Sequence, residues 1–282
     1  MVLCLVIFDL LRLFNFPCKY GFYISLFLTL SALSYGYYNY QHPETKVINI
    51  VINKQATHNE HLLKVVSVSD IHLGYGTDKE KLKQYVELIN AQQPDLILIG
   101  GDLIDNSVVP LYEEKMAEEL AKLKAPLGIY MVPGNHEYIS DIRKSMRFIS
   151  ETPIRLLRDE VVALPGGIQI IGRDDRSNKS RLSLQELTKR IDPAKPAILL
   201  DHQPYDLPDT EQAGIDLQFS GHTHRGQIWP VSLITDYLFD QSHGYRQWGD
   251  SHIYVSTGLS LWGPPFRIGT DSELVVFNIT CK

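Results

Sequence analysis

The stretch SGHTHRGQ at residues 220–227 places two histidines, His222 and His224, one residue apart on a turn that glycines flank. It follows the alternating apolar stretch 215–219, a pattern typical of a β-strand. Residues i and i+2 of a strand point to the same side, so both imidazoles can face one object. Two solvated loop histidines would give the same pattern, so a metal site here requires further ligands elsewhere in the chain.

Four other polar clusters occupy an equivalent position, directly after a predicted strand. They are DIH (70–72), GDLID (101–105), GNHE (134–137) and DH (201–202). In open α/β sheets, ligands bind at the edge where the strands end. Each cluster alone would also fit a turn or a helix cap. Together with the turn at 220–227, they indicate one shared site.

These clusters offer carboxylate, amide and imidazole donors. The candidates are Asp70, His72, Asp102, Asn135, His202, His222 and His224. Mixed nitrogen and oxygen ligands without thiolate suit Mn, Fe or Zn. The set is too large for one transition ion and predicts two divalent metal ions, about 3.5–4 Å apart, that share a carboxylate. Such a pair would bind a phosphodiester or pyrophosphate and provide a water nucleophile.

Outside these clusters, short apolar strands alternate with amphipathic helices. The sequence predicts strands over 47–52, 63–68, 96–99, 128–132, 168–171, 197–200, 217–219, 253–255 and 274–277, and helices over 78–93, 113–124, 139–149 and 182–191. Several strands are apolar throughout, which is typical of a sheet covered on both faces. The pattern therefore predicts an α/β core with helices on the sheet faces.

Composition indicates a folded globular protein and argues against two other classes, nucleic-acid-binding proteins and proteins built on disulfides or thiolate-bound zinc. Of 282 residues, 44% are hydrophobic and 21% charged, as in a folded globular chain. The net charge of −6 argues against nucleic acid as a partner, because such proteins carry a basic surface. Cys4, Cys18 and Cys281 are too scattered for a disulfide framework or a thiolate zinc site.

The N-terminal part of the chain differs in kind. Residues 20–43 contain no Asp, Glu, Lys or Arg, and tyrosines lie at both ends of the apolar stretch. That pattern predicts a membrane helix. A cleaved signal peptide is the alternative, with 22–33 as its apolar region. We expect a membrane segment and linker at 1–45, a single domain at 46–282, and attachment to the inner (plasma) membrane.

Apart from Asp9, Arg12 and Asn15, residues 1–16 are also apolar and are compatible with a second, shorter or re-entrant membrane segment, with Pro17 as the break. If only residues 20–40 span the membrane, Arg12 and Lys19 favour a cytoplasmic N-terminus and an outward-facing domain. If both segments span it as a hairpin, the domain returns to the N-terminal side. Both orientations stay open.

The five clusters together resemble the calcineurin-like metallophosphoesterase superfamily over about residues 62–280. The resemblance implies a two-sheet β-sandwich flanked by helices, four layers in all. It implies that a first metal is held by Asp70, His72, Asp102 and His224. It implies that a second is held by Asp102, Asn135, His202 and His222. In this family the residue matching His136 contacts the phosphate and assists the leaving group.

The N-terminal segment, the GQI at 226–228 and the PPFRIG at 264–269 are similar to bacterial membrane-anchored phosphoesterases. Some of these are UDP-2,3-diacylglucosamine hydrolases of lipid A synthesis, which implies a lipid-linked substrate. An envelope phosphodiesterase or phosphatase with soluble substrates and a non-catalytic metal-bound scaffold are the alternatives. Arg225 stands where relatives commonly have Gly, and either contacts substrate phosphate or lies on the surface.

The segment 227–239, QIWPVSLITDYLF, is apolar and has Asp236 as its one charged residue. Because it follows His224 closely, its start must lie near the predicted metals. It is either a connection packed in the core or an exposed apolar lip that admits acyl chains from the bilayer.

Overall fold

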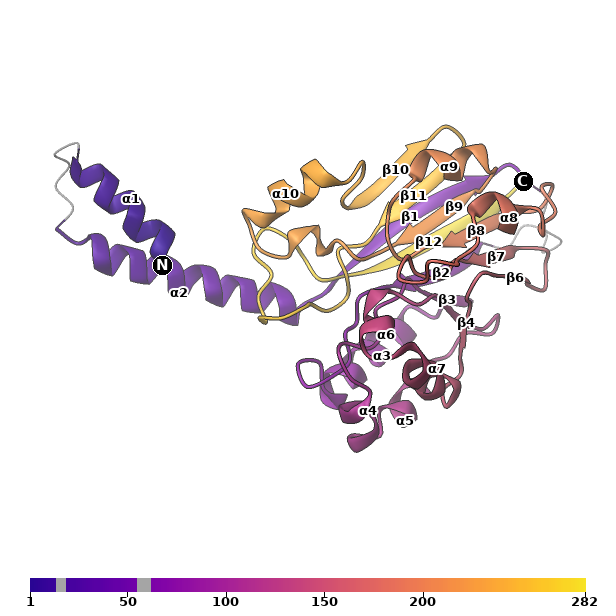
Figure 1. The fold of residues 1–282 in the computed structure, drawn as a ribbon, viewed down its shortest axis with the longest axis horizontal. Helices are drawn as coiled ribbons and strands as arrows, with labels where there is room; N and C mark the ends of the chain where they lie inside the picture. The colour runs from indigo at the N-terminus through magenta and orange to yellow at the C-terminus, as the bar shows by residue number, and fades with distance from the viewer. Residues whose placement is uncertain (14–18, 55–61) are drawn as a thin grey trace.

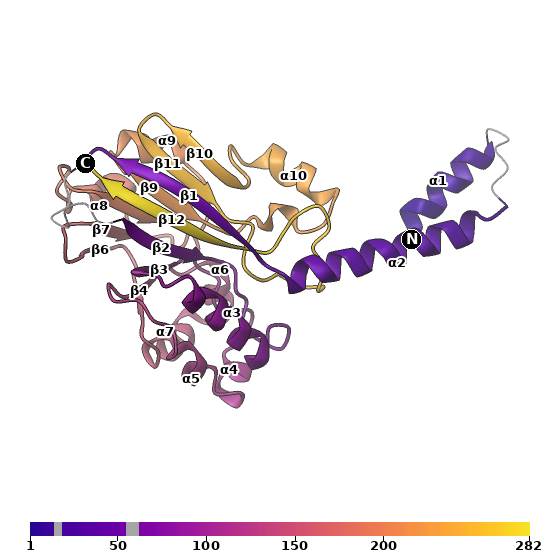
Figure 2. The ribbon, with the colours of Figure 1, turned by 180° about the vertical axis from the view of Figure 1, so that it is seen from behind.

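The structure, a computed structural model, describes residues 1–13, 19–54 and 62–282. Within this part of the chain, two six-stranded sheets pack face to face (Figures 1 and 2). In spatial order, sheet one contains β1 (Glu44–Ile52), β12 (Glu273–Cys281), β2 (Leu63–Val68), β3 (Leu96–Ile99), β4 (Ile129–Met131) and β5 (Ile154–Leu156). Sheet two contains β10 (Gly244–Trp248), β11 (Ser251–Val255), β9 (Leu217–Ser220), β8 (Ala197–Leu200), β7 (Gln169–Gly172) and β6 (Glu160–Ala163).

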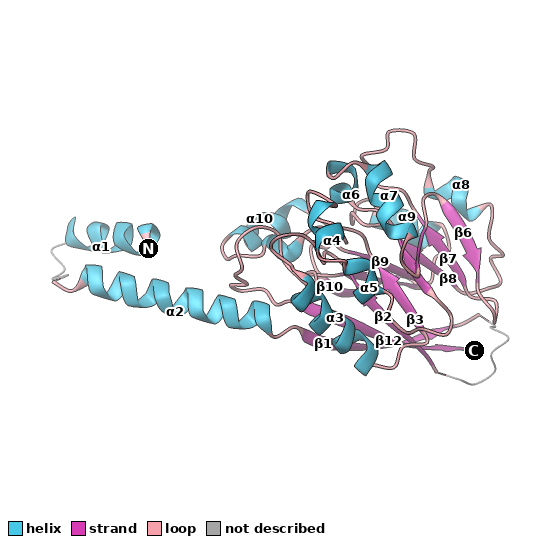
Figure 3. Cartoon of the chain, turned by 90° about the horizontal axis from the view of Figure 1, so that it is seen from below, coloured by secondary structure: helices cyan, strands magenta, loops and turns pink. Residues whose placement is uncertain are grey.

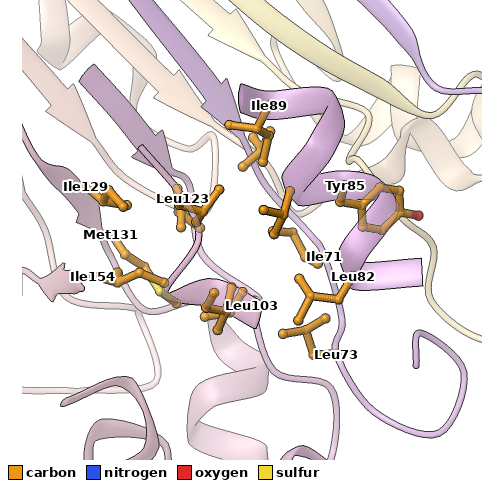
Figure 4. Packing of buried hydrophobic residues seen from close by; sticks show 14 of the residues in the cluster. Ile71, Leu73, Leu82, Tyr85, Ile89, Leu103, Leu123, Ile129, Met131 and Ile154 are labelled. Carbon is orange, nitrogen blue, oxygen red and sulfur yellow. The ribbon is translucent and has the colours of Figure 1, made fainter. Parts of the chain in front are cut away.

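Helices cover the outer face of each sheet (Figure 3). On sheet one they are α3 (Lys79–Ala91), α4 (Val109–Glu113), α5 (Met116–Leu120) and α7 (Ile142–Ser150), whose apolar side chains share one buried cluster with the strands. Figure 4 shows part of this cluster, including Leu82, Tyr85 and Ile89 of α3. On sheet two they are α8 (Leu184–Thr188) and α9 (Leu207–Gln212). The expectation of a mixed α/β fold with two sheets is confirmed.

The apolar strands are explained by this layering. In β3, Leu96 and Leu98 face sheet two, whereas Ile97 and Ile99 face the helices. A strand buried on both sides needs apolar residues at successive positions, so the simple alternation of an exposed sheet disappears. Strands β2, β3 and β4 run parallel, as do β7, β8 and β9. Their C-terminal ends therefore lie at common edges, where the polar clusters follow.

Two expected helices are each interrupted. The helix predicted over 113–124 is replaced by α4 and α5, separated at Lys115, which has a left-handed φ of 52°. The helix predicted over 139–149 becomes α6 (Asn135–Ile139) and α7, with Asp141 at φ 72° and its carboxylate accepting from the backbone N of Arg143. The chain therefore turns sharply after the GNHE cluster, which a continuous helix would not permit.

The N-terminal residues form α1 (Val2–Leu13) and α2 (Gly21–Gln41), which pack against each other and extend away from the domain (Figure 1). A helix forms where a membrane span was predicted. Among the described residues, however, none of the helices combines the length and apolarity that crossing a bilayer requires. The expectation of a membrane-spanning helix is corrected accordingly, because tyrosines, serines and glycines interrupt the apolar residues of α2. Pro17, the expected break, lies outside the described residues.

Candidate metal centre

Each candidate ligand lies just beyond the C-terminal end of a strand. Asp70 and His72 follow β2, Asp102 follows β3, Asn135 follows β4, His202 follows β8, and His222 and His224 follow β9. Five of them have left-handed φ values between 47° and 74°: Asp70, His72, Asp102, His222 and His224. That conformation costs a non-glycine residue about 1 kcal/mol and persists where surrounding contacts enforce it, as at functional sites.

Asp70, His72 and His224 form a first ligand group, whose donor atoms all lie within 4.8 Å of one another. The Nε2 atoms of His72 and His224 are 3.1 Å apart. Nε2 of His224 lies 3.4 Å from Oδ1 of Asp70. Two imidazole nitrogens and a carboxylate oxygen thus converge on one small volume, and all three residues are buried.

A second ligand group consists of Asp102, His202, His222 and Asn135. Nε2 of His202 lies 3.1 Å from Oδ2 of Asp102, and Nδ1 of His222 lies 2.9 Å from Oδ1 of Asn135. The same Oδ2 of Asp102 is 3.9 Å from Nε2 of His72 in the first group. Asp102 therefore lies between the two groups, where a bridging carboxylate would be needed.

The pKa shifts of three candidate ligands, Asp102, His222 and His224, favour the forms that bind a cation. Burial raises the pKa of Asp102, but the neighbouring His202, His72 and His136 outweigh it and hold that pKa below its ordinary value. Burial and His202 together lower the pKa of His222 to about 4. Burial and the Arg267 guanidinium lower the pKa of His224. Burial lowers the pKa of His202, but the charge of Asp102 outweighs it and raises that pKa well above its ordinary value, so a cation bound there would displace a proton. An ionised carboxylate and neutral imidazoles are the forms that ligate metals.

Unsatisfied polar atoms test whether a metal fits. Nε2 of His202 is buried and has no hydrogen-bond partner within the described part of the chain, although it faces the Asp102 carboxylate. Burying such a nitrogen without a partner is costly, and a cation would satisfy it. The donor set, its burial and this atom together fit divalent metal ions at both groups.

His136 lies beside both groups, and its backbone N donates to Oδ1 of Asp102 at 2.8 Å. Its Nδ1 is 3.1 Å from the carbonyl oxygen of Asp105 and 3.2 Å from Oδ1 of the same residue. Oδ1 of Asp105 also lies 3.6 Å from Nδ1 of His72. Asp105 was not among the predicted site residues, although it ends the GDLID cluster; its position three residues after Asp102 was the available signal.

Glu137 is a second residue whose role the sequence did not disclose. Its buried carboxylate accepts hydrogen bonds from the backbone N atoms of Asp102, Gly134 and Ile104, at 3.0, 2.7 and 3.0 Å. Burial and the charge of Asp102 raise the pKa of Glu137 to about 7. These hydrogen bonds connect the turn after β3 with the turn after β4 and stabilise both. A Cβ on Gly134 would lie 2.1 Å from Oδ1 of Asp102, so this close approach requires glycine.

Apart from its start at the buried Gln227, most of the segment 227–239 proves to be exposed. It forms α10 (Val231–Leu238), in which Ser232 is the buried residue, while Trp229, Leu238 and Tyr237 are 54%, 62% and 87% exposed. The alternative of a core-packed connection is therefore wrong. Its end also approaches the site, since the Phe239 ring lies 6.3 Å from the ring of His222. An apolar helix thus runs from the turn that carries His224 to the neighbourhood of His222.

Arg225 lines a cavity of about 290 Å³, together with Lys46, His243, Tyr245 and Glu273 among others. Its contact with substrate phosphate stays a prediction.

The fold and the site define a class: a two-sheet α/β protein with a buried carboxylate–imidazole centre at its strand ends. Residues 63–226 match the family model for calcineurin-like phosphoesterases, and the chain belongs to that family. An uncharacterized metallophosphoesterase from Helicobacter pylori (strain J99) is 34% identical over 94% of this chain and 70% of that protein. Family and donor cluster together support a metal-dependent phosphoesterase.

A bovine protein named "Transmembrane protein with metallophosphoesterase domain" is 32% identical over 75% of this chain, which spans about half (52%) of that relative. Among solved structures, a 5'-nucleotidase precursor from Thermus thermophilus aligns over 77% of this chain and 55% of its own, with a TM-score of 0.45 and 14% identity. A likeness of that degree says nothing about activity.

Proposed function

We propose that the protein is a dinuclear metal-dependent phosphoesterase that hydrolyses a phosphodiester or pyrophosphate bond on a lipid-linked substrate such as UDP-2,3-diacylglucosamine. The observation that carries the hydrolase is Asp102, whose carboxylate lies 3.1 Å from His202 and 3.9 Å from His72, each in a different ligand group. One carboxylate between two clusters of imidazoles is the arrangement that two ions sharing a ligand would use.

Asp70, His72, Asp102 and His224 would hold one ion, and Asp102, Asn135, His202 and His222 the other. Divalent ions there, of Mn, Fe or Zn, would supply an activated water and offset the charge that develops on phosphorus.

His136 has a separate role in this proposal. Because Nδ1 of His136 is held by the carbonyl and carboxylate oxygens of Asp105, Nε2 is left to hold a proton for the departing oxygen. Burial lowers the pKa of His136, but the hydrogen bond to Asp105 and the charge of Asp102 outweigh it, so the pKa is raised above its ordinary value. A protonated imidazole is the form that a general acid needs.

Exposed apolar helices support the lipid-linked substrate. Helix α10 borders the site and presents Leu233, Ile234 and Leu238 to solvent, and monomeric soluble proteins rarely expose such patches without a binding role. Helix α2 presents Phe22 and Phe27 and leaves the domain at the end where α10 lies (Figures 1 and 2). We place both helices against the inner (plasma) membrane, and the name of the bovine relative is consistent with that placement.

A hydrolysis screen on the purified, Mn-loaded full chain tests the proposal. It compares UDP-2,3-diacylglucosamine with bis-p-nitrophenyl phosphate and p-nitrophenyl phosphate, each with and without a chelator. We expect chelator-sensitive hydrolysis with the highest kcat/KM on the diacyl substrate. Higher kcat/KM on the small substrates would indicate an enzyme for soluble esters. Bound metal without turnover on any substrate would indicate a scaffold and overturn the proposal.

A further inference from the structure

Arg267 connects helix α2 with a candidate metal ligand. Its side chain is fully buried (0% exposed). The guanidinium donates to the carbonyl oxygen of His224 at 3.2 Å and lies 3.3 Å from Nδ1 of the same imidazole. It also donates to the carbonyl oxygens of Gly258 and Ser260 and to the hydroxyl of Thr270. A rigid, charged fork thus holds the backbone of His224 by a hydrogen bond and lies in contact with its ring.

The backbone of Arg267 is fixed to α2. Its N donates to the carbonyl oxygen of Gly36 at 2.9 Å, and its carbonyl oxygen accepts from Nδ2 of Asn39 at 3.4 Å. A Cβ on Gly36 would lie 2.6 Å from Cγ1 of Ile268 and 3.3 Å from the carbonyl oxygen of Arg267. The helix therefore approaches residues 267 and 268 so closely that only glycine fits at position 36.

The C-terminal end of α2 is correspondingly part of the domain. Tyr40 is buried, and the Lys81 ammonium of α3 lies 4.9 Å from its ring centroid and 2.8 Å from Oε1 of Gln41. The first turns of the same helix are exposed, as Phe22 and Phe27 illustrate. One end of α2 is thus available to a membrane surface, while the other end lies against Arg267.

Packing around the guanidinium leaves little room for independent movement. A Cβ on Gly258 would lie 3.0 Å from Cβ of Asp70, 3.2 Å from Nη2 of Arg267 and 3.2 Å from Nδ1 of His224. Two members of the first ligand group and Arg267 therefore surround a position that has no side chain. A shift of the 267–268 backbone would move the guanidinium and with it the imidazole of His224.

We propose that Arg267 is a positioning residue that couples the position of α2 to the first ligand group. Displacement of α2 from residues 267 and 268 would then weaken metal binding at that group. The second group does not depend on Arg267. Nδ1 of its member His202 lies 2.8 Å from the carbonyl oxygen of Gly100, which directly follows β3 at the edge of sheet one. The coupling rests on the ligand set of the proposed function, and it goes beyond that function by making the N-terminal helix a determinant of metal occupancy.

Mn²⁺ titration of the full chain, with metal analysis of each variant, tests this coupling. Arg267→Met retains the length of the side chain and removes its donors. We expect the affinity for one of two ions to fall about 10–100-fold, the usual effect of losing a residue that orients a ligand, with the other ion unchanged. Arg267→Lys, which keeps the charge without the fork, should give an intermediate loss. His224→Ala identifies which ion belongs to the first group.

Gly36→Val provides a second variant far from the ligands, in case Arg267→Met does not fold. It should weaken the same ion, because its side chain displaces α2 from residues 267 and 268. Ser34→Val, on the exposed face of the same helix, is the matched control and should bind both ions as the wild type does. Undiminished affinity for both ions in Gly36→Val and Arg267→Met, or an equal loss of both ions, would overturn the coupling. Failure of the proposed function would appear separately, as wild-type protein that binds two ions without hydrolysing any ester.

Discussion

The two ligand groups differ in what holds them in place. In the second group, His202 is fixed by the Gly100 carbonyl, and Asp102 by the Glu137 carboxylate, both at the edge of sheet one. In the first group, His224 is fixed by Arg267, from a segment that also carries the contact with α2. One group is thus completed by the strand ends, and the other by a distant part of the chain. Within one metal centre, the position of some candidate ligands can therefore be fixed by the core sheets, while the position of others depends on elements outside the core.

The largest effect is expected where the groups meet. Asp102→Asn keeps the size of the side chain but removes the negative charge shared by both groups. Each ion contributes several kcal/mol to transition-state stabilisation, so the loss of both should lower the rate by more than about 10⁴-fold. Metal analysis and turnover on bis-p-nitrophenyl phosphate measure the two consequences together. Two ions bound at wild-type affinity would remove Asp102 from the bridging position.

His222→Ala is the matched comparison for Asp102→Asn. The His222 ring contacts Asn135, which belongs to the second group. Its backbone N donates to Asp70 of the first group, and this hydrogen bond is retained in His222→Ala. We expect one ion to be lost and the other retained. If His222→Ala removed both ions as Asp102→Asn does, the division into two groups would be wrong.

The next prediction separates chemistry from metal binding. His136→Ala should keep both ions and lower the rate about 10²–10⁴-fold, the range for loss of a general acid. The loss should be greatest for esters with poor leaving groups, because these need the proton most. Single-turnover rates across leaving groups measure it. A uniform loss that accompanies a fall in metal content would instead make His136 a ligand, which its proximity to His72 and Asp102 permits geometrically.

The sequence predicted which candidate ligands come together better than it predicted what orients them. Asp70, Asp102 and His202 each follow an apolar strand, and the carboxyl ends of parallel strands meet at one edge, so local pattern was sufficient to group them. Arg267 gave no such signal, because the PPFRIG motif that contains it does not directly follow a predicted strand, and its contact with His224 depends on the tertiary fold. Long-range contacts of this kind leave no period in the sequence.

Local conformation also limited the sequence reading. Lys115 and Asp141 interrupt their helices with positive φ values, which residue propensities do not anticipate because a propensity is only a weak preference at each position. Segment 227–239 illustrates a further limit. Its apolar residues fit a buried or an exposed helix equally well, and the structure was needed to distinguish the two.

The smallest expected effect concerns α10, which touches the neighbourhood of both groups without supplying a ligand. Trp229→Ser with Leu238→Ser removes two exposed apolar side chains, so stability should change by no more than about 0.5 kcal/mol each. If acyl chains lie against α10, losing these contacts should cost about 1–3 kcal/mol, or about 5–150-fold in kcat/KM on UDP-2,3-diacylglucosamine. Metal content and turnover of bis-p-nitrophenyl phosphate should remain at wild-type levels.

A matched control for α10 is Val109→Ser with Met146→Ser, which removes exposed apolar side chains from the helices over sheet one. It should leave the kcat/KM of both substrates unchanged. Selective loss on the acyl substrate in the α10 variant alone would show that lipid recognition is separable from both ligand groups. Equal loss on both substrates would mean that α10 acts on the metal centre itself, through the bond from the Trp229 backbone N to the Ile268 carbonyl. In that case α10 would belong with α2 among the peripheral elements on which the first group depends.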